Sequence, residues 1–279
     1  MKKMMIALAV ILFCSTAIYA QNLKMPAPSS TQSVTQEFGL GSIKLTYARP
    51  SVKGRKIFGG LVPYNEVWRT GANSATLLHF SDDVKIEGNT LSAGEYGLFT
   101  IPGQTEWTII LNKDSKQWGA YEYKKENDVL RIKVKPEKLP SKKETFTIAF
   151  DDVMPTSLKL TLAWENVSVP VKITTEVDEK VMANIEEAMK GEKKPYFQAA
   201  YYYFENGKDL KKALEWATLA DAASPKAPWV KLLKAKIQLK TGDKKGAAAT
   251  AQEGVRVATE IKNPEYIRLH SNLLAEAKK

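Results

Sequence analysis

The segment VWRTGAN holds the side chains of this sequence that are best suited to binding a ligand. Arg69 carries five N–H donors in a planar fork, a geometry that fits a carboxylate or a phosphate. Trp68 offers a flat apolar face, and the amide of Asn73 both donates and accepts hydrogen bonds. Arg49 and Arg55 flank the same loop, so these five residues are candidates for binding a sugar or an acid.

A structural interpretation of the same segment needs no ligand. Trp68 then fills the hydrophobic core, Arg69 pairs with a buried carboxylate or with carbonyl groups, and Gly71 and Asn73 form a turn. We favour this interpretation and keep ligand binding as the alternative.

The sequence lacks the common motifs for catalysis and metal binding. His79 and His270 are the only histidines, and HExxH and CxxC spacings are absent, so we predict no metal and no cofactor. GxSxG is also absent, and we predict no catalytic residue. His79 falls in an expected strand, where a local hydrogen bond explains it, and it is the sixth candidate for ligand binding. Adjacent acids at Asp82-Asp83 and Asp151-Asp152 fit turn chemistry, with calcium binding or a glycosidase pair as alternatives.

The first 20 residues have the layout of a secretory signal peptide. Lys2 and Lys3 precede an unbroken apolar run, residues 6–13, and small residues place the cut between Ala20 and Gln21. The run is too short to span a bilayer, which takes about 20 apolar residues. We therefore expect an exported protein of the periplasm or cell envelope whose mature chain has no transmembrane span.

Cys14 is the only cysteine and lies within the segment that we expect to be removed. A lipid-anchored cysteine is the alternative, but Phe13 stands where lipoprotein processing usually needs a small residue. With the cut after Ala20, the mature protein has no disulfide and depends on its core alone.

The formal charge of the chain is +10, and the loss of Lys2 and Lys3 lowers it to +8. Basic residues are spread through both halves and mixed with acidic ones, whereas nucleic-acid-binding proteins concentrate them on one face or helix. We expect a solvated lysine-rich surface and no nucleic-acid partner, with attraction to anionic envelope polymers as the alternative.

Apolar and polar side chains alternate in short runs over residues 31–173, which is typical of antiparallel sheets with one buried face. We expect about nine strands, including separate ones at residues 158–164 and 167–173. Short strands at this spacing predict a jelly-roll-like β-sandwich, with a closed barrel as the alternative. Gly88-Asn89 is expected to close a tight hairpin, because both residues tolerate positive φ.

The alternation is interrupted over residues 49–73, which are rich in glycine and still apolar. A long loop with this composition must pack on something, and long ordered loops are often functional. Trp107, Trp118 and Tyr96 lie outside this loop and are assigned to the sandwich core.

Four motifs, KGR, IFGGLVPY, VWRTGAN and AGEYGLFTIPG, occur together in the strand-rich half. With them, residues 25–173 resemble the DUF2911 family of bacterial exported proteins. The resemblance implies a bacterial protein, from the Bacteroidota, in the periplasm or on the envelope. It implies no activity and supplies no catalytic residue, because the family is named for its unknown function.

The pattern becomes helical near residue 177, where Ala, Lys, Glu and Leu recur at helical spacing. Asp178 is expected to cap a first helix with Val181, Ile185 and Met189 on one face, and Gly191 is expected to end it. Five more helices are expected, at residues 195–206, 209–223, 227–241, 243–261 and 264–278.

A weak internal repeat joins these helices, because Gly207 and Gly242 are 35 residues apart and small residues recur around them. The pattern resembles a tetratricopeptide unit, although Gly254 stands where an alanine is expected. We predict a tetratricopeptide-like stack of helical hairpins, with an ordinary helical bundle as the alternative.

Together these patterns predict an α+β protein of separate domains: a leader at residues 1–20, an antiparallel β-sandwich at 21–173, and an all-α helical-hairpin stack at 177–279. We predict a non-enzymatic binding protein with a small-molecule or polysaccharide ligand on the β domain and a protein partner on the helical domain. The alternatives are a hydrolase that uses Arg69, His79 and a carboxylate, and a purely structural or assembly role.

Overall fold

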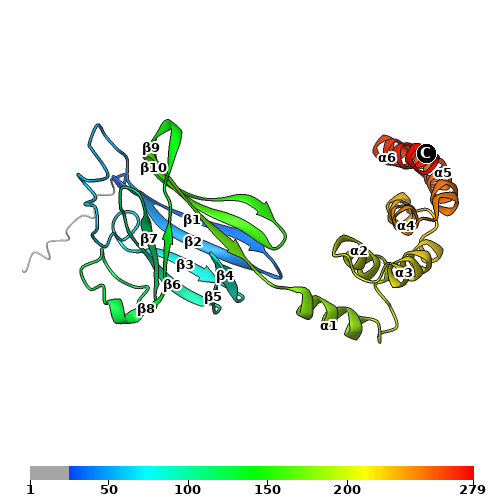
Figure 1. The fold of residues 1–279 in the computed structure, drawn as a ribbon, viewed down its shortest axis with the longest axis horizontal. Coiled ribbons are helices and arrows are strands. Elements are labelled where there is room, and N and C mark those ends of the chain that lie inside the picture. The colour runs from blue at the N-terminus through cyan, green and yellow to red at the C-terminus, as the bar shows by residue number, and fades with distance from the viewer. Residues whose placement is uncertain (1–24) are drawn as a thin grey trace, which may run out of the picture. The chain divides into compact units, whose positions relative to one another are not determined.

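The computed structural model describes residues 25–279 (Figure 1), so the predicted signal peptide and Cys14 lie outside the described residues. The chain divides into two compact units, one that ends at Glu176 and one that begins at Val177. Within the described residues, the first unit holds the strands and the second holds six α-helices. The predicted α+β class, with antiparallel sheets followed by a helical stack, is confirmed.

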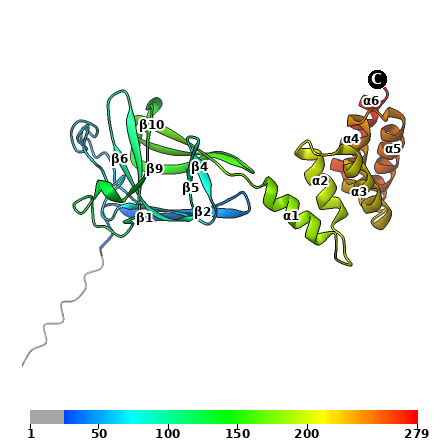
Figure 2. The same cartoon turned by 60° about the horizontal axis from the view of Figure 1, so that its bottom comes forward.

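Ten strands, where about nine were expected, form two antiparallel sheets that lie over one another as a sandwich (Figures 1 and 2). One sheet has the order β1-β2-β3-β6-β7-β8 and the other the order β5-β4-β10-β9. The strands are β1 (Ser30–Phe38), β2 (Gly41–Arg49), β3 (Thr76–Phe80), β4 (Val84–Ile86), β5 (Asn89–Leu91), β6 (Gly94–Ile101), β7 (Trp107–Asn112), β8 (Asp128–Val134), β9 (Glu137–Met154) and β10 (Ser157–Thr174), with one 3₁₀ turn at Lys125–Asn127.

The core of the β unit is built by the inward faces of both sheets and by the loop between β2 and β3. Its centre is aromatic: the rings of five residues pack with centroids 5.0–6.4 Å apart. Burying an aromatic side chain of this size contributes roughly 1.5–3 kcal/mol to stability. The five residues are Phe58, Trp68, Trp107, Phe146 and Trp164.

The last strand, β10, corrects the prediction of two separate strands. In the first half of β10 the even-numbered residues, such as Leu158 and Leu162, are buried, whereas in the second half the odd-numbered residues, such as Val169 and Val171, are buried. A β-bulge at Glu165, whose φ is 53°, shifts the register against β9 and changes the phase by one residue. The break in the apolar–polar alternation therefore marks a β-bulge within one long strand and not the boundary between two strands.

The hairpin between β4 and β5 turns one residue earlier than predicted. Ile86 pairs with Asn89, so the two loop residues are Glu87 (φ 48°) and Gly88 (φ 81°). Asn89 begins β5 instead, and its side-chain amide donates a 3.1 Å hydrogen bond to the carbonyl oxygen of Glu87.

Six helices form the second unit, close to the predicted spans, and no helix within residues 25–279 is both long and apolar enough to cross a membrane. Small buried residues, such as Ala200, Ala213 and Ala247, lie where neighbouring helices meet. The tetratricopeptide-like character of this stack stays a prediction. The helices are α1 (Asp178–Ala188), α2 (Tyr196–Glu205), α3 (Leu210–Ala223), α4 (Pro228–Lys240), α5 (Lys244–Glu260) and α6 (Pro264–Ala277).

The predicted cap at Asp178 is wrong, because Val177 is the N-cap residue of α1 and its side chain makes no capping bond. Asp178 instead accepts hydrogen bonds from the Lys208 ammonium (2.7 Å) and the Tyr202 hydroxyl (2.9 Å). These two bonds hold the pKa of Asp178 below its usual value and tie α1 to α2.

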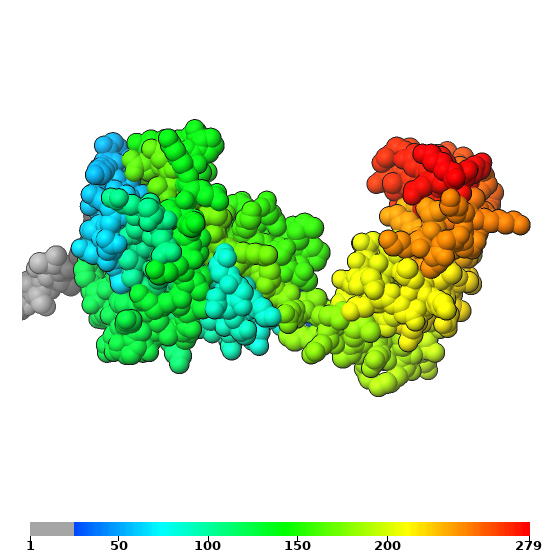
Figure 3. All heavy atoms as spheres, viewed as in Figure 1, coloured from blue at the N-terminus to red at the C-terminus, as the bar shows by residue number. Residues whose placement is uncertain are grey.

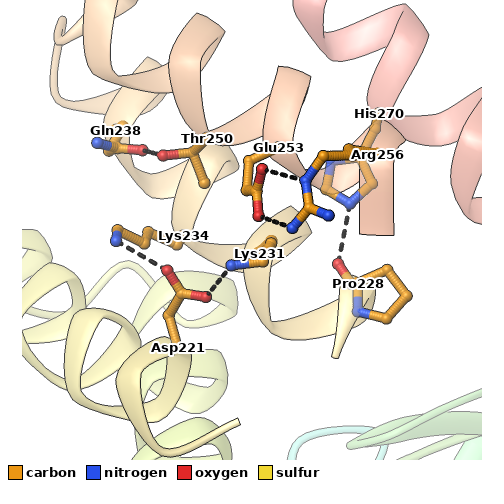
Figure 4. Close-up of polar contacts among 9 residues, drawn as sticks. All are labelled: Asp221, Pro228, Lys231, Lys234, Gln238, Thr250, Glu253, Arg256 and His270. Atoms are coloured by element: carbon orange, nitrogen blue, oxygen red, sulfur yellow. Dashed lines mark hydrogen bonds and ion pairs between the residues drawn. The ribbon is translucent and has the colours of Figure 1, made fainter. Parts of the chain in front are cut away.

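Polar contacts cross the helical unit between neighbouring helices (Figure 4). Asp221 of α3 pairs with Lys231 (2.7 Å) and Lys234 (3.0 Å) of α4. His270 of α6 is fully buried, and its Nε2 lies 2.9 Å from the carbonyl oxygen of Pro228 at the start of α4. The ion pairs and the buried imidazole thus connect α3 and α6 to the central helix α4.

Candidate functional site

A cavity of about 640 Å³ opens in the β unit beside the loop between β2 and β3. Its polar lining comes from that loop and from two short segments next to it. The lining residues that carry charged, hydroxyl or amide side chains are Ser29, Arg55, Glu66, Arg69, Asn73 and Tyr121.

The first half of the loop is tied to β9. The amide of Val52 donates to the carbonyl oxygen of Glu144 (2.8 Å), and the amide of Phe146 donates to that of Pro50 (2.8 Å). In Figure 3 blue surface, the colour of residues near 50, lies beside green surface, the colour of residues near 150. A loop held in this way presents a fixed wall to the cavity.

The second half of the loop is fixed by a short bridge to β6. Trp68 and Thr100 exchange backbone hydrogen bonds of 2.7 and 2.9 Å. The indole of Trp68 stacks on Trp164 and donates to the carbonyl oxygen of Gly71 at 3.1 Å. Trp68 is 8% exposed, so it fills the core as the structural interpretation expects, and little of its surface is left open to the cavity.

Thr70 holds a strained backbone conformation next to Trp68. Its φ is 56°, a region that is unfavourable for a β-branched residue, and the residue is completely buried. Its hydroxyl lies 3.1 Å from the hydroxyl of Thr100, and its carbonyl oxygen accepts a 2.6 Å hydrogen bond from Thr76. This network of buried threonines fixes the backbone on both sides of Thr70, and with it the direction in which Arg69 leaves the chain.

Arg69 has no counterion among the described residues. Its side chain makes no hydrogen bond or ion pair within residues 25–279, and its Nε is buried without a partner. A buried donor that lacks an acceptor costs about 1–3 kcal/mol, and such a group calls for a water or a ligand. The prediction that Arg69 pairs with a buried carboxylate or carbonyl group is therefore wrong for residues 25–279.

The other charged and amide groups of the lining are more accessible. Arg55 is exposed and donates to the carbonyl oxygens of Val52 (3.0 Å) and Ser51 (2.6 Å) in its own loop. Glu66 and Asn73 are exposed as well, and Asn73 has a positive φ of 59° that places it in a turn. Two guanidinium groups and one carboxylate thus share the cavity, in which Arg69 is the most enclosed.

An exposed aromatic side chain stands at the edge of the cavity. Tyr121 is 84% exposed, and its ring lies over the α-carbon of Gly119, where an added Cβ would come within 2.7 Å of it. Trp118, which was assigned to the core, is 65% exposed instead. The reason is that its segment lies outside the sandwich, held to the VWRTGAN loop by a bridge between Trp118 and Ser74.

Two of the six candidates lie elsewhere. Arg49 is not among the residues that line the cavity, and its guanidinium joins the sheets through Phe146 (3.2 Å) and Thr147 (3.1 Å). His79 is exposed in the middle of β3, between Lys44 and Glu95 of the neighbouring strands, and it does not line the cavity either. The structure therefore gathers Trp68, Arg69, Asn73 and Arg55 but not Arg49 or His79.

Sequence reasoning missed two residues that line the cavity, Glu66 and Tyr121, and one buried residue that supports it, Thr70. Glu66 and Thr70 lie within the loop already singled out, and their types gave no separate signal. Tyr121 lies about 50 positions further along, and only the bridge at Ser74 brings its segment to the loop. Among residues 25–279, no group of three or more His, Cys, Asp or Glu side chains is placed to hold a metal ion.

Comparison with known proteins gives one match. Residues 29–173, more than half of the 279 residues, match the family described as "Protein of unknown function (DUF2911)". No curated protein and no solved structure matches the chain. The matched region spans the β-sandwich and the whole VWRTGAN loop, and the chain accordingly belongs to the DUF2911 family.

Proposed function

We propose that this chain is an exported binding protein whose β unit holds a small acidic ligand against Arg69. The observation that carries the proposal is the guanidinium of Arg69, whose Nε is buried without a partner among the described residues, in a cavity of about 640 Å³. Cavities of about 300–1,000 Å³ are typical of small-molecule sites, and a planar guanidinium fits a carboxylate or phosphate through two parallel hydrogen bonds.

The rigid backbone around Arg69 supports the same proposal. Strained residues persist where the surrounding structure forces them, and they cluster at ligand sites. Here the strained residue is Thr70 (φ 56°), which directly follows Arg69 in the chain. A backbone fixed in advance loses less entropy when the ligand binds, which favours affinity.

The binding role is preferred to the hydrolase alternative. That alternative needed His79 near Arg69, and His79 is absent from the cavity lining. A proton-transfer group must lie within hydrogen-bond reach of the reacting atoms, so His79 has no role at this cavity.

The test is a thermal-shift and calorimetric titration of the full mature chain with acetate, succinate and inorganic phosphate. An acid at 100 times its Kd adds about 2.7 kcal/mol to the free energy of unfolding. In a domain of this size each kcal/mol raises the melting temperature by about 2–4 °C. Arg69→Ala removes this rise. Lys133→Ala is the matched control, because it also removes one positive charge, from an exposed pair with Glu106 outside the cavity lining.

The free Arg69→Ala protein provides a second readout. No hydrogen bond to the described residues is lost with this side chain, so the ligand-free protein should unfold at the same temperature as the wild type or slightly higher. The proposal fails if no acid binds the wild type, or if Arg69→Ala binds the acids equally well.

Export is part of the proposal and rests on the leader pattern of Lys2, Lys3 and residues 6–13. Mass spectrometry of the protein from the native host should give a chain that begins at Gln21. A chain that begins at a lipid-modified Cys14 would support the lipoprotein alternative, and a full-length chain would oppose export.

The helical unit favours a second role, the docking of a protein partner. A groove of about 410 Å³ between α1 and α2 is lined almost wholly by apolar atoms, and Tyr201 on its edge is 52% exposed. The exposed Lys193 and Lys194 precede α2, so we propose a partner segment that combines apolar and acidic residues. A labelled peptide of leucine and glutamate should bind the wild type and bind Tyr201→Ala more weakly; equal binding would reject the groove.

A further inference from the structure

We infer that the ligand of the cavity beside Arg69 is an acidic sugar, a pyranose ring that carries one carboxylate. This inference rests on the proposed function and names the class of ligand. Three features beyond Arg69 lead to it: the exposed ring of Tyr121, the charge of the lining and the size of the cavity.

The ring of Tyr121 has the properties of a stacking platform. The ring packs against the backbone of Gly119, where an added Cβ would come within 2.7 Å of it, and the residue is 84% exposed. A large aromatic side chain held in place yet open to water is informative, because folding usually buries such a surface. The apolar C–H face of a pyranose fits a ring of this kind, in the same way that other amphipathic groups do.

The position of Tyr121 relative to the loop is fixed by the backbone. The amide of Gly119 donates a 3.0 Å hydrogen bond to the carbonyl oxygen of Asn73, and Ser74 bridges to Trp118. Both Tyr121 and Asn73 line the cavity with Arg69. A single ring-sized ligand is therefore offered an aromatic face, an amide and a guanidinium from two segments that are bonded together.

The charges of the lining favour one carboxylate over several phosphates. Arg69 has no counterion among residues 25–279, Arg55 is partly engaged by its own loop, and Glu66 adds a negative charge. A polyphosphate would be repelled by Glu66, whereas sugar hydroxyls can donate hydrogen bonds to its carboxylate. A monoanion with several hydroxyl groups satisfies all three side chains.

The size of the cavity exceeds what a simple acid needs. Its volume of about 640 Å³ and its apolar wall, which includes Leu61, Pro63 and Val67, leave room for a ring beyond the carboxylate. Leu61 is 48% exposed, so part of this apolar wall is open to a ligand.

The experiment compares glucuronate, glucose, acetate, inorganic phosphate and adenosine monophosphate by calorimetric titration of the full mature chain. We expect glucuronate to bind at least about tenfold more tightly than acetate, because stacking adds to the carboxylate contact. Glucose should bind far more weakly than glucuronate. An oligomer of galacturonate distinguishes a polymer end from a free sugar, and binding of either one supports the inference.

Variants separate the two contacts. Tyr121→Ala should weaken glucuronate binding about five- to tenfold and leave acetate binding unchanged, while Tyr121→Phe should restore glucuronate binding because it keeps the ring. Arg69→Lys should weaken both acids, because it keeps the charge but loses the fork. Trp229→Ala, which removes an exposed aromatic ring of the helical unit (46% exposed), is the control and should change neither.

The outcomes distinguish this inference from the proposed function. If acetate or phosphate binds through Arg69 and the sugar ring or Tyr121 adds nothing, the acidic-sugar inference is overturned and the proposed function stands. Tighter binding of adenosine monophosphate than of glucuronate likewise overturns the inference in favour of a nucleotide. If none of the probes binds, both fail.

Discussion

Thr70 and Arg69 show how much of this site depends on single residues. Thr70 keeps a φ of 56°, a strain of about 1–3 kcal/mol, and the hydroxyl groups of Thr100 and Thr76 hold it there. Arg69, the preceding residue, is thereby aimed at a cavity where no described carboxylate meets it. The residue types in VWRTGAN suggested a ligand site, but whether Arg69 is paired depends on segments that are distant in sequence.

His270 gives a prediction of pH dependence. It is 0% exposed, its Nε2 donates to the carbonyl oxygen of Pro228, and its Nδ1 has no partner among the described residues. Burial lowers the pKa of His270 below its ordinary 6.5; the hydrogen bond to Pro228 opposes this effect, and the nearby Lys231 adds to it. The unfolded chain therefore binds a proton at a higher pH than the folded chain does.

The sign of the effect follows from this difference in proton binding. At pH values above about 6.5 the His270 imidazole is neutral in both the folded and the unfolded state, and the full stability is present. As the pH falls below 6.5, the imidazole of the unfolded chain takes up a proton first. The unfolded state then gains up to about 1.4 kcal/mol for each unit of difference between the two pKa values. Urea unfolding of the helical unit at pH 7.5, 6.0 and 5.0 should show this loss. His270→Asn should flatten the pH dependence, whereas the exposed His79→Asn should not; equal slopes in all three proteins would contradict the prediction.

At the level of elements, the contact between α5 and α6 explains why Gly254 departs from the alanine that the repeat pattern predicts. A Cβ at this position would lie 2.1 Å from Cε1 of the His270 ring. The glycine makes room for the imidazole, and the hydrogen bond from His270 to Pro228 then joins α6 to α4 (Figure 4).

Gly254→Ala tests this packing, because two effects oppose each other. Helix propensity favours alanine by about 1 kcal/mol, but overpacking of a closed core costs about 1–3 kcal/mol. We expect a lower melting temperature for the helical unit, since the buried ring has little room to move. In a His270→Ala background the same substitution should stabilise, and a double-mutant cycle in the full chain measures the difference. Additive effects would show that the ring and the glycine do not compete for space.

The elements themselves were predicted unequally well. The helices follow from local spacing and from their glycine and proline ends, so their spans agree closely with the structure. The β10 bulge at Glu165 and the turn at Glu87 were missed, because strand pairing fixes both. A change of alternation phase between Trp164 and Val167 was visible in the sequence, but only the partner strand shows that the chain continues through it.

The whole molecule consists of two units with separate hydrophobic cores. We therefore expect two unfolding transitions in scanning calorimetry of the mature chain. Gly254→Ala should lower only one of them, and an acid bound at Arg69 should raise only the other, because a ligand stabilises the unit that binds it. A single transition that responds to both changes would show that the two cores unfold together.

The sequence alone determined the features that depend on local or periodic patterns: an apolar leader pattern, alternating strands before residue 173, helices after 177, and four motifs that identify the family. Period-two and period-3.6 patterns specify which faces are buried without any knowledge of the partner element. The sequence also drew attention to VWRTGAN, because its residue types suit an acid or a sugar.

Only the tertiary structure decided which of those residues share a site. Trp68 enters the core because Trp164 and Phe146 stack around it, and Arg49 is used to join the two sheets. Tyr121 reaches the cavity because its segment bridges to Ser74. Each of these outcomes depends on contacts between segments about 50 to 100 positions apart, and long-range pairing of this kind leaves no local periodic signal in the sequence.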